Sequence, residues 1–371
     1  MKQDNGLTRA VTITAMSLIP FLSAGCSLAL AEEVSGERAG APVESGAESA
    51  RYEVSHPQMG VLFKIAFYAP SRSQAEAASA AAVARIDAVN AIFTNYSSES
   101  EAMRLCHSAP HAQPQPISDE MCLVLDMSQR MHAASGGVFD VTVGSITKLW
   151  RRARRRRQWP TPEQWREAAA PVGMQGVELS AVGSKKFARL TREGVRFDFG
   201  GVAKGYAADE AINVLKEHGI VRALVDASGD ITVGEAPPGE TGWKIAIRTD
   251  PRADEEVPEG RDARKPLALS LAHVAVATSG DATQFFIHQG VRYSHIVDPR
   301  TGRPVAGAAT VTVIARTGAE ADMLASAVSV LGCCEGKRLI EKTPGAAARI
   351  DTPLGEKRHA VTTRGFSRWI D

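Results

Sequence analysis

The sequence predicts an α+β fold in which mixed sheets pack against helices. It contains alternating apolar runs typical of strands and apolar residues at helical spacing, and the two kinds of element are interspersed without strict alternation. The composition is that of a globular protein, because 44% of the 371 residues are hydrophobic and 23% are charged. A disordered chain would carry fewer apolar residues and a larger net charge.

The charge balance and hydropathy argue against two classes of function. The 43 Lys and Arg residues nearly equal the 42 Asp and Glu residues, which leaves a formal net charge of +1. Such a chain has no overall basic field, so its charge gives no support to nucleic-acid binding. Only one apolar run, close to the N-terminus, approaches spanning length, which excludes a polytopic membrane protein.

Residues 1–31 have the layout of an export signal. Lys2 and Arg9 precede the apolar run 10–22, and Ala31 ends a site that an ordinary signal peptidase would cleave. A second reading stays open, because the segment before Cys26 resembles a bacterial lipobox and would leave that cysteine lipidated. Either way we expect the body of the protein to lie outside the cytoplasm.

A flexible tether and one large domain are expected after the signal. Residues 32–50 are rich in Gly, Ala, Ser and Glu, a composition typical of flexible linkers. No strong internal linker follows, and the charged stretch 250–265 is interpreted as an insertion between strands. We therefore treat residues 51–371 as one domain.

The first half of that domain begins with a strand and two helices. Residues 61–67 alternate in the manner of a strand. Residues 73–93 are alanine-rich, with apolar residues at helical spacing from Ala82 to Phe93, and predict a helix. Residues 122–134 predict a second helix, which ends before a pair of glycines.

The second half continues with further strands and helices. Residues 195–199, the helix 203–218 closed by Gly219, and residues 222–226 predict a β-α-β unit. The remaining expected elements are strands at 244–249, 267–277 and 308–315 and a helix at 319–331.

A glycine turn at 198–206 is the first candidate binding site. An acid, Asp198, ends the expected strand, and two glycines lead into a helix that carries Lys204. Glycines allow a ligand to approach the backbone, and a helix N-terminus offers free N–H groups to anions. For the glycines alone, an ordinary turn with a surface lysine is the simpler interpretation.

A histidine and a helical pair are further candidates. His295 precedes an Asp-Pro turn and lies three residues from Asp298, which suits general acid–base work or metal binding, although a lone histidine is more often structural. Asp322 and Ser326 share a helix face at i, i+4 spacing and offer hard oxygens to Mg²⁺. An acid that merely stabilises the helix N-terminus is the alternative for that pair.

Taken together, six segments resemble the FAD:protein FMN transferases of the ApbE type, a family of exported, Mg²⁺-dependent flavin transferases. They are FDVTVG at 139–144, DFGGVAKGY at 198–206, SGDI at 228–231, SGD at 279–281, SHIVDP at 294–299 and ADMLAS at 321–326. Each motif alone is weak, but six in the family's order are specific. The resemblance covers about residues 52–332 and implies the ApbE fold.

The resemblance implies roles for the matched positions. The backbone carbonyl of Gly201, with Asp322 and Ser326, would hold Mg²⁺ against the FAD pyrophosphate. His295 would be the general base, with Asp298 near it. The other positions implied to contact FAD are Met59, Tyr96, Val138, Phe139, Asp140, Asp198, Lys204 and Ile296.

The implied reaction is transfer of FMN from FAD to a Thr or Ser hydroxyl of a target protein, with release of AMP. We expect the acceptor to be a membrane or periplasmic redox protein, and the enzyme itself to be periplasmic, with inner-membrane attachment through Cys26 as the lipidated alternative. Two other functions stay open: a periplasmic FAD pyrophosphatase that yields FMN and AMP, and a flavin-binding protein without catalysis.

One segment departs from the family. After Trp150, where the family usually has a glycine-aromatic turn, residues 151–157 are almost all arginine, and residues 148–157 carry seven cations. A solvated helix face is the simpler interpretation. The sharper hypothesis is that the segment recruits an acidic partner or an anionic lipid surface.

Overall fold

The computed structural model describes residues 13–16, 49–247, 249, 266–280, 284–307, 309–354 and 357–371. Cys26, most of the expected signal and tether, the stretch 250–265 and Asp281 lie outside the described residues. Within those ranges, no helix has both the length and the apolar character needed to cross a bilayer.

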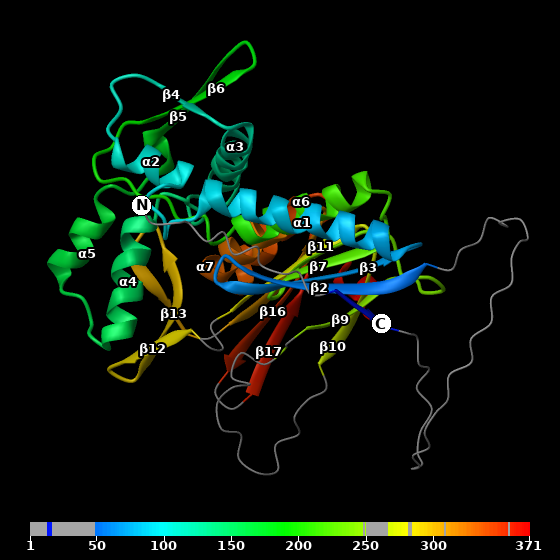
Figure 1. The fold of residues 1–371 in the computed structure, drawn as a ribbon. Helices are drawn as coiled ribbons and strands as arrows, with labels where there is room; N and C mark the ends of the chain where they lie inside the picture. Colours follow the sequence, from blue (N-terminus) through cyan, green and yellow to red (C-terminus); the bar gives the residue numbers. More distant parts are fainter. Residues whose placement is uncertain are drawn as a thin grey trace, which may run out of the picture.

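A nine-stranded sheet forms the centre of the molecule (Figure 1). In spatial order its strands are β1 (Ile13–Met16), β2 (Ala50–Gln58), β3 (Val61–Ala69), β7 (Ala223–Ala227), β8 (Asp230–Val233), β11 (Val274–Gly280), β15 (Thr310–Ala315), β16 (Ala347–Leu354) and β17 (Lys357–Thr362). Each neighbouring pair is antiparallel. The expected strand at 61–67 is therefore confirmed as β3, paired with β2.

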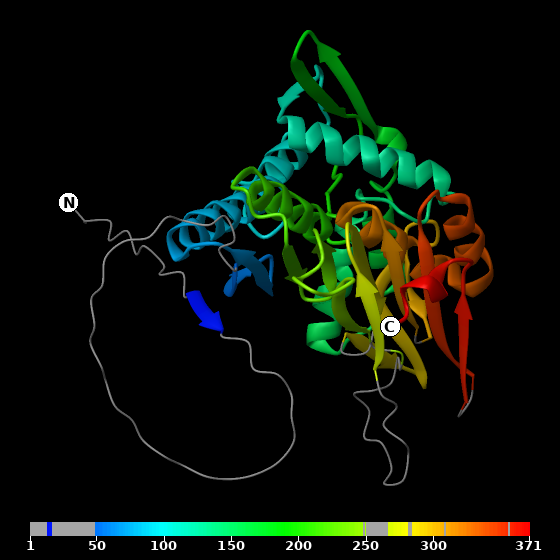
Figure 2. The same cartoon turned by 90° about the vertical axis from the view of Figure 1, so that its right-hand side faces the viewer.

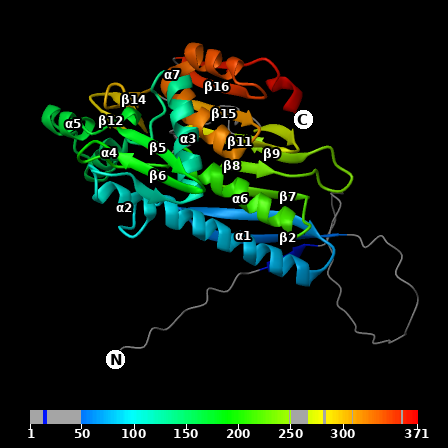
Figure 3. The ribbon, with the colours of Figure 1, turned by 90° about the horizontal axis from the view of Figure 1, so that it is seen from above.

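Helices cover one face of this sheet and a small second sheet covers the other. The helices α1 (Arg72–Phe93), α6 (Ala203–Glu217) and α7 (Gly318–Lys342) lie together on one side (Figures 1 and 3). Phe63, Ile65 and Phe67 point into the core beneath them. Ala66, between those residues, packs instead toward β9 (Trp243–Ile247) and β10 (Leu267–Leu271) on the opposite face. This alternation is the strand periodicity seen in the sequence.

Two smaller parts complete the fold. The sheet of β4 (Gln115–Ile117), β6 (Lys185–Leu190) and β5 (Val177–Val182) lies near α2 (Glu101–His107) and α3 (Asp119–Ala134), and its hairpin projects at the top of the molecule (Figures 1 and 2). The sheet of β12 (Phe285–His288), β13 (Val291–Asp298) and β14 (Arg303–Ala306) packs against α4 (Gly144–Arg156) and α5 (Pro162–Ala169). Short 3₁₀ helices occupy Met174–Gly176 and Phe366–Trp369.

The α+β class is confirmed, but the β-α-β unit expected at 195–226 is wrong. Residues 195–199 form no strand and pair only through a parallel bridge of Arg196 with Val143. The backbone N–H of Asp198 donates to the carbonyl of Val141, and that of Phe197 donates to Sγ of Cys106. The alternating burial of this extended segment imitates a strand, although its partners are loop and helix residues rather than a ladder.

A second difference concerns residues 267–277, which form two strands rather than one. β10 and β11 are separated by a turn in which His273 has φ 54°. The apolar run continues through the turn, so periodicity alone did not mark the break.

Helices α6 and α7 approach each other unusually closely near their first turns. A Cβ atom on Gly205 would lie 2.1 Å from the backbone oxygen of Gly318, so only glycine fits there. The backbone N–H of Gly205 also points to Oδ2 of Asp322 at 3.5 Å. This contact places Lys204 of α6 beside Asp322 of α7.

Candidate active site

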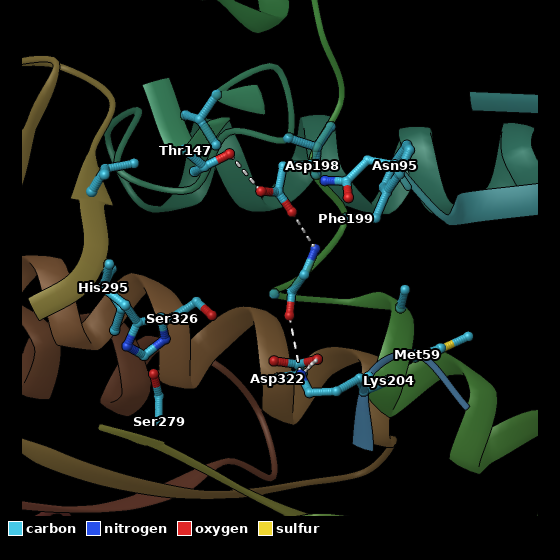
Figure 4. A pocket seen from close by; sticks show the side chains of 18 of the residues that line it. Met59, Asn95, Thr147, Asp198, Phe199, Lys204, Ser279, His295, Asp322 and Ser326 are labelled. Atoms are coloured by element: carbon cyan, nitrogen blue, oxygen red, sulfur yellow. Dashed lines mark hydrogen bonds and ion pairs between the residues drawn. The ribbon is translucent and has the colours of Figure 1, made fainter. Parts of the chain in front are cut away.

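The candidate site is a cavity of about 600 Å³ at which the large sheet, its helices and the α4 region meet. The turn between β2 and β3 supplies Met59, and the loop after α1 supplies Tyr96. The other walls come from residues 138–143, the start of α6, the end of β11, the strand β13 and the first half of α7. Figure 4 shows their side chains around one shared space.

Asp198 is fixed on one wall by three donors. Its Oδ2 accepts hydrogen bonds from the Thr147 hydroxyl at 2.6 Å and from Arg151 at 2.8 Å. Its Oδ1 accepts from the backbone N–H of Gly200 at 3.0 Å (Figure 4). The structure thus brings Asp198 to the cavity, and it adds Thr147 and Arg151, which sequence reasoning missed.

Tyr96 lies at the rim of the cavity and is 81% exposed. Its hydroxyl accepts a hydrogen bond from Arg151 at 2.7 Å, and the Arg151 guanidinium lies 5.4 Å from the centre of its ring. Arg151 therefore links an exposed aromatic side chain to the half-buried carboxylate of Asp198.

Lys204 lies between two buried carboxylates on the opposite wall. Its Nζ is 2.8 Å from Asp230 and 3.5 Å from Asp322, and it donates to the carbonyl of Gly200 at 3.1 Å. Burial alone would lower the pKa of Lys204, but the two carboxylates outweigh it and raise the pKa above its ordinary value. Asp230 was not singled out as a site residue, although it belongs to the SGDI segment.

The oxygen donors expected for a metal lie close together. Asp322 and Ser326 are one turn apart on α7, and a Cβ atom on Gly201 would lie only 2.7 Å from Oγ of Ser326. Burial and the neighbouring charge of Asp230 raise the pKa of Asp322 above its ordinary value. Lys204 acts in the opposite direction but does not outweigh these two effects, and a divalent cation would add the positive charge that favours the ionised carboxylate.

This donor set fits Mg²⁺ if the substrate contributes the remaining ligands. Within the described ranges, no group of three or more His, Cys, Asp or Glu side chains could hold a metal. Mg²⁺ characteristically binds through one or two protein carboxylates together with substrate phosphates and water. The backbone oxygen of Gly201, the Ser326 hydroxyl and the Asp322 carboxylate are donors of that kind.

His295 projects from β13 toward the same space as Ser279 and Ser326 (Figure 4). Its Nδ1 is buried and has no hydrogen-bond partner among the described residues. Burial, and then the positive charges of Arg154 and Lys204, lower the pKa of His295 from 6.5 to about 4. The imidazole is therefore neutral at pH 7 and able to accept a proton.

The low pKa of His295 predicts a loss of stability in mild acid. Between pH 6.5 and about 4 the unfolded chain protonates this histidine while the folded protein does not, so its contribution to stability falls as the pH falls. Replacing His295 with Gln should make the decline in melting temperature from pH 7 to pH 4 shallower than in the parent protein.

The comparison with the His295 variant is needed because Asp209 changes the stability of the protein with pH in the opposite direction. Burial raises the pKa of Asp209 to about 6, so that residue contributes more stability as the pH falls. Subtracting the two melting curves removes its effect, and parallel curves would contradict the assignment to His295.

Two expected site residues have other uses. Asp298 is not among the residues that line the cavity, and both of its carboxylate oxygens accept from Arg300 within the turn, so its expected role beside His295 stays a prediction. Asp140 lines the cavity, but its carboxylate accepts from Thr142 and from the backbone N–H of Met174 and thereby fixes the surrounding loop. These bonds hold the Asp140 carboxylate in place at the cavity wall, and its contact with FAD stays a prediction.

The remaining expected positions reach the cavity. They are Met59, Tyr96, Val138, Phe139, Asp198, Gly201, Lys204, His295, Ile296, Asp322 and Ser326. The arginine segment also reaches it, which corrects the interpretation as a purely solvated face. The helix itself is confirmed as α4, but Arg151 and Arg154 are half-buried and line the cavity.

Comparison with known proteins yields matches over most of the chain. The model of the ApbE family matches residues 59–350. The chain is 28% identical over 319 residues to the FAD:protein FMN transferase of Klebsiella pneumoniae. That alignment covers 84% of this chain and 85% of the relative. It is 30% identical over 262 residues to the FAD:protein FMN transferase of Treponema pallidum. That alignment covers 67% of this chain and 70% of the relative.

A solved structure agrees with these relatives. The flavinyl transferase ApbE of Pseudomonas stutzeri in its apo form superposes with a TM-score of 0.75 at 25% sequence identity. The match covers 87% of this chain and 97% of that protein. The likeness therefore extends over nearly the whole of the described fold.

Proposed function

This chain belongs to the ApbE family, and from that membership we infer that it is an FAD:protein FMN transferase with FAD as its substrate. We propose that it joins FMN to a Thr or Ser hydroxyl of an acceptor protein and releases AMP. One observation carries the proposal: a single cavity gathers a neutral buried histidine and the oxygen donors of Gly201, Asp322 and Ser326.

Mg²⁺ is the proposed metal of the reaction. The Asp322 carboxylate, the Ser326 hydroxyl and the Gly201 carbonyl would hold it, and the metal would neutralise negative charge that develops on the phosphate oxygens. Lys204 supplies a second, permanent positive charge on the same wall, and its carboxylate partners keep it protonated.

His295 is proposed as the general base. Its neutral imidazole removes the proton from the acceptor hydroxyl, and the resulting oxygen attacks the FMN-side phosphorus of FAD. A new bond forms between that oxygen and phosphorus as the bond to the AMP phosphate breaks, and AMP leaves with the electron pair.

The acceptor is proposed to be a membrane or periplasmic redox protein, and the enzyme is proposed to act in the periplasm. The layout of residues 1–31 as an export signal supports that location. If Cys26 is lipidated, the enzyme would be attached to the inner membrane.

The test is to incubate the protein with FAD, Mg²⁺ and a candidate acceptor, and to measure the acceptor mass and the AMP released. We expect one FMN adduct on a Thr or Ser for each AMP. AMP and free FMN without an adduct would instead identify an FAD pyrophosphatase. Bound, unchanged FAD would identify a flavin-binding protein without catalysis.

A further inference from the structure

A second hollow of about 680 Å³ opens beside the active-site cavity. It shares Tyr96, Arg151 and Arg154 with that cavity, so the two are continuous. Three more cations line only this hollow: Lys148, Arg155 and Arg196. We call it the cationic groove, and none of the described residues that line it carries a carboxylate.

The cations of the groove are poorly compensated. Arg151 is paired with Asp198 at 2.8 Å, whereas the part of the chain that the structure describes offers Lys148, Arg155 and Arg196 no carboxylate partner. At Arg154, Nε is buried, and no residue in the described ranges forms a hydrogen bond with it. Like charges gathered in this way raise the free energy of the empty groove and favour the binding of an anion.

The orientation of α4 is fixed by its apolar side. Ile146, Leu149 and Trp150 are buried in a cluster with α5 and β13, and the Trp150 indole N–H donates to the carbonyl of Ser294 at 2.8 Å. Lys148 and Arg155 therefore face the groove. Two other arginines of the helix, Arg152 and Arg156, line a different hollow toward α5.

We propose that the cationic groove binds a carboxylate-rich segment of the acceptor protein, next to the Thr or Ser that enters the cavity. This rests on the proposed function. The expected site of the FAD pyrophosphate is the opposite wall, at Asp322 and Ser326, so it does not account for Lys148, Arg155 and Arg196. A polypeptide can extend continuously from the cavity into the groove and place several carboxylates along it.

The net charge of the chain supports a specific rather than a general attraction. With a formal charge of +1, the protein as a whole would not attract acidic partners, so an acidic segment would be attracted by a local cationic surface such as this groove. Binding through exposed cations is screened by salt, and it should therefore weaken as ionic strength rises.

The first test uses a probe that needs no catalysis: a fluorescent hexa-aspartate peptide, with hexa-asparagine as its neutral counterpart. The groove variant combines Lys148→Gln with Arg155→Gln. The control variant combines Arg152→Gln with Arg156→Gln, which removes the same charge from the same helix on another side. At low salt the groove variant should bind hexa-aspartate about tenfold more weakly than the control variant.

The second test uses an acceptor that the parent enzyme modifies. The groove variant should raise the KM for the acceptor about tenfold more than the control variant does, and the difference should vanish near 0.5 M salt, where the Debye length is only about 4 Å. Replacing Asp and Glu near the modified residue of the acceptor with Asn and Gln should remove the same difference.

Several outcomes would overturn the proposal. Equal losses in the two variants would show a non-specific charge effect. A lower affinity for FAD in the groove variant would assign the groove to FAD. Groove-dependent binding to phosphatidylglycerol vesicles without binding of hexa-aspartate would assign it to lipid.

The two proposals fail in different ways. If the parent protein binds hexa-aspartate through the groove but modifies no acceptor, the proposed function fails and the groove remains an acidic-peptide site. If it modifies an acceptor equally well in both variants, the function stands and the groove proposal is wrong.

Discussion

Replacing Asp322 with Asn is expected to lower FMN transfer about a thousandfold, because the buried carboxylate would no longer be available to a divalent cation. The amide keeps the shape of the side chain, so the helix contact with α6 should survive. The measurement is AMP release as a function of Mg²⁺ concentration, and the residual activity of the variant should need far more Mg²⁺.

Glu320→Gln is a matched control for that experiment. Glu320 lies on the first turn of the same helix, α7, but does not line the cavity. Its replacement removes one carboxylate and should leave turnover and Mg²⁺ dependence nearly unchanged. Parent-like activity of the Asp322 variant at low Mg²⁺ would contradict the assignment of Asp322 as a metal ligand.

Replacing His295 with Gln should lower the turnover number for transfer by about 10²–10⁴-fold, the usual contribution of a positioned general base. FAD binding should change little, because the proposed role of this side chain is toward the acceptor hydroxyl. The residual rate of the variant should rise with pH as hydroxide replaces the missing base, whereas the parent enzyme should vary little above pH 6 because its histidine is already neutral.

His359→Gln controls for the general effect of removing a histidine. His359 is exposed on β17 and does not line the cavity, so transfer should continue at the parent rate. If the His295 variant kept the parent turnover number and the parent pH profile, another group would have to be the base.

The local parts of the site could be predicted from the sequence. Asp322 and Ser326 are one helical turn apart, so their shared face follows from helix geometry alone. Lys204 follows directly on the glycine turn that it helps to close through its bond to the Gly200 carbonyl. Patterns of this kind depend only on residues that are neighbours in the chain.

Contacts between distant segments were beyond such reasoning. Thr147 and Arg151 meet Asp198 across 51 and 47 residues of chain, and no spacing rule connects them. The arginine segment could be identified as cationic, but which of its side chains face the cavity depends on how Trp150 anchors the helix. The sequence alone therefore identifies the cationic residues, but it does not show which of their side chains point into the cavity.

The surroundings of Asp298 also depend on a local contact. Proximity in sequence suggested that Asp298 lies near His295, but β13 does not alternate strictly at this point, because its register against β14 shifts between Tyr293 and Val297. Arg300, two residues further on, takes both carboxylate oxygens of Asp298. The carboxylate of Asp298 is therefore occupied within its own turn, a contact that its spacing from His295 does not reveal.

The backbone contact of Gly205 with Gly318 bears on how much the protein must rearrange during a turnover. It fixes the spacing of α6 and α7, and with it the spacing of Lys204 and Asp322, through main-chain atoms that have no rotamers to change. A site whose charges are already oriented contributes little reorganisation free energy when phosphate charge shifts from FAD to AMP. Most of the adjustment should therefore fall on the acceptor and on the exposed side chains at the rim, such as Tyr96 and the cations of α4.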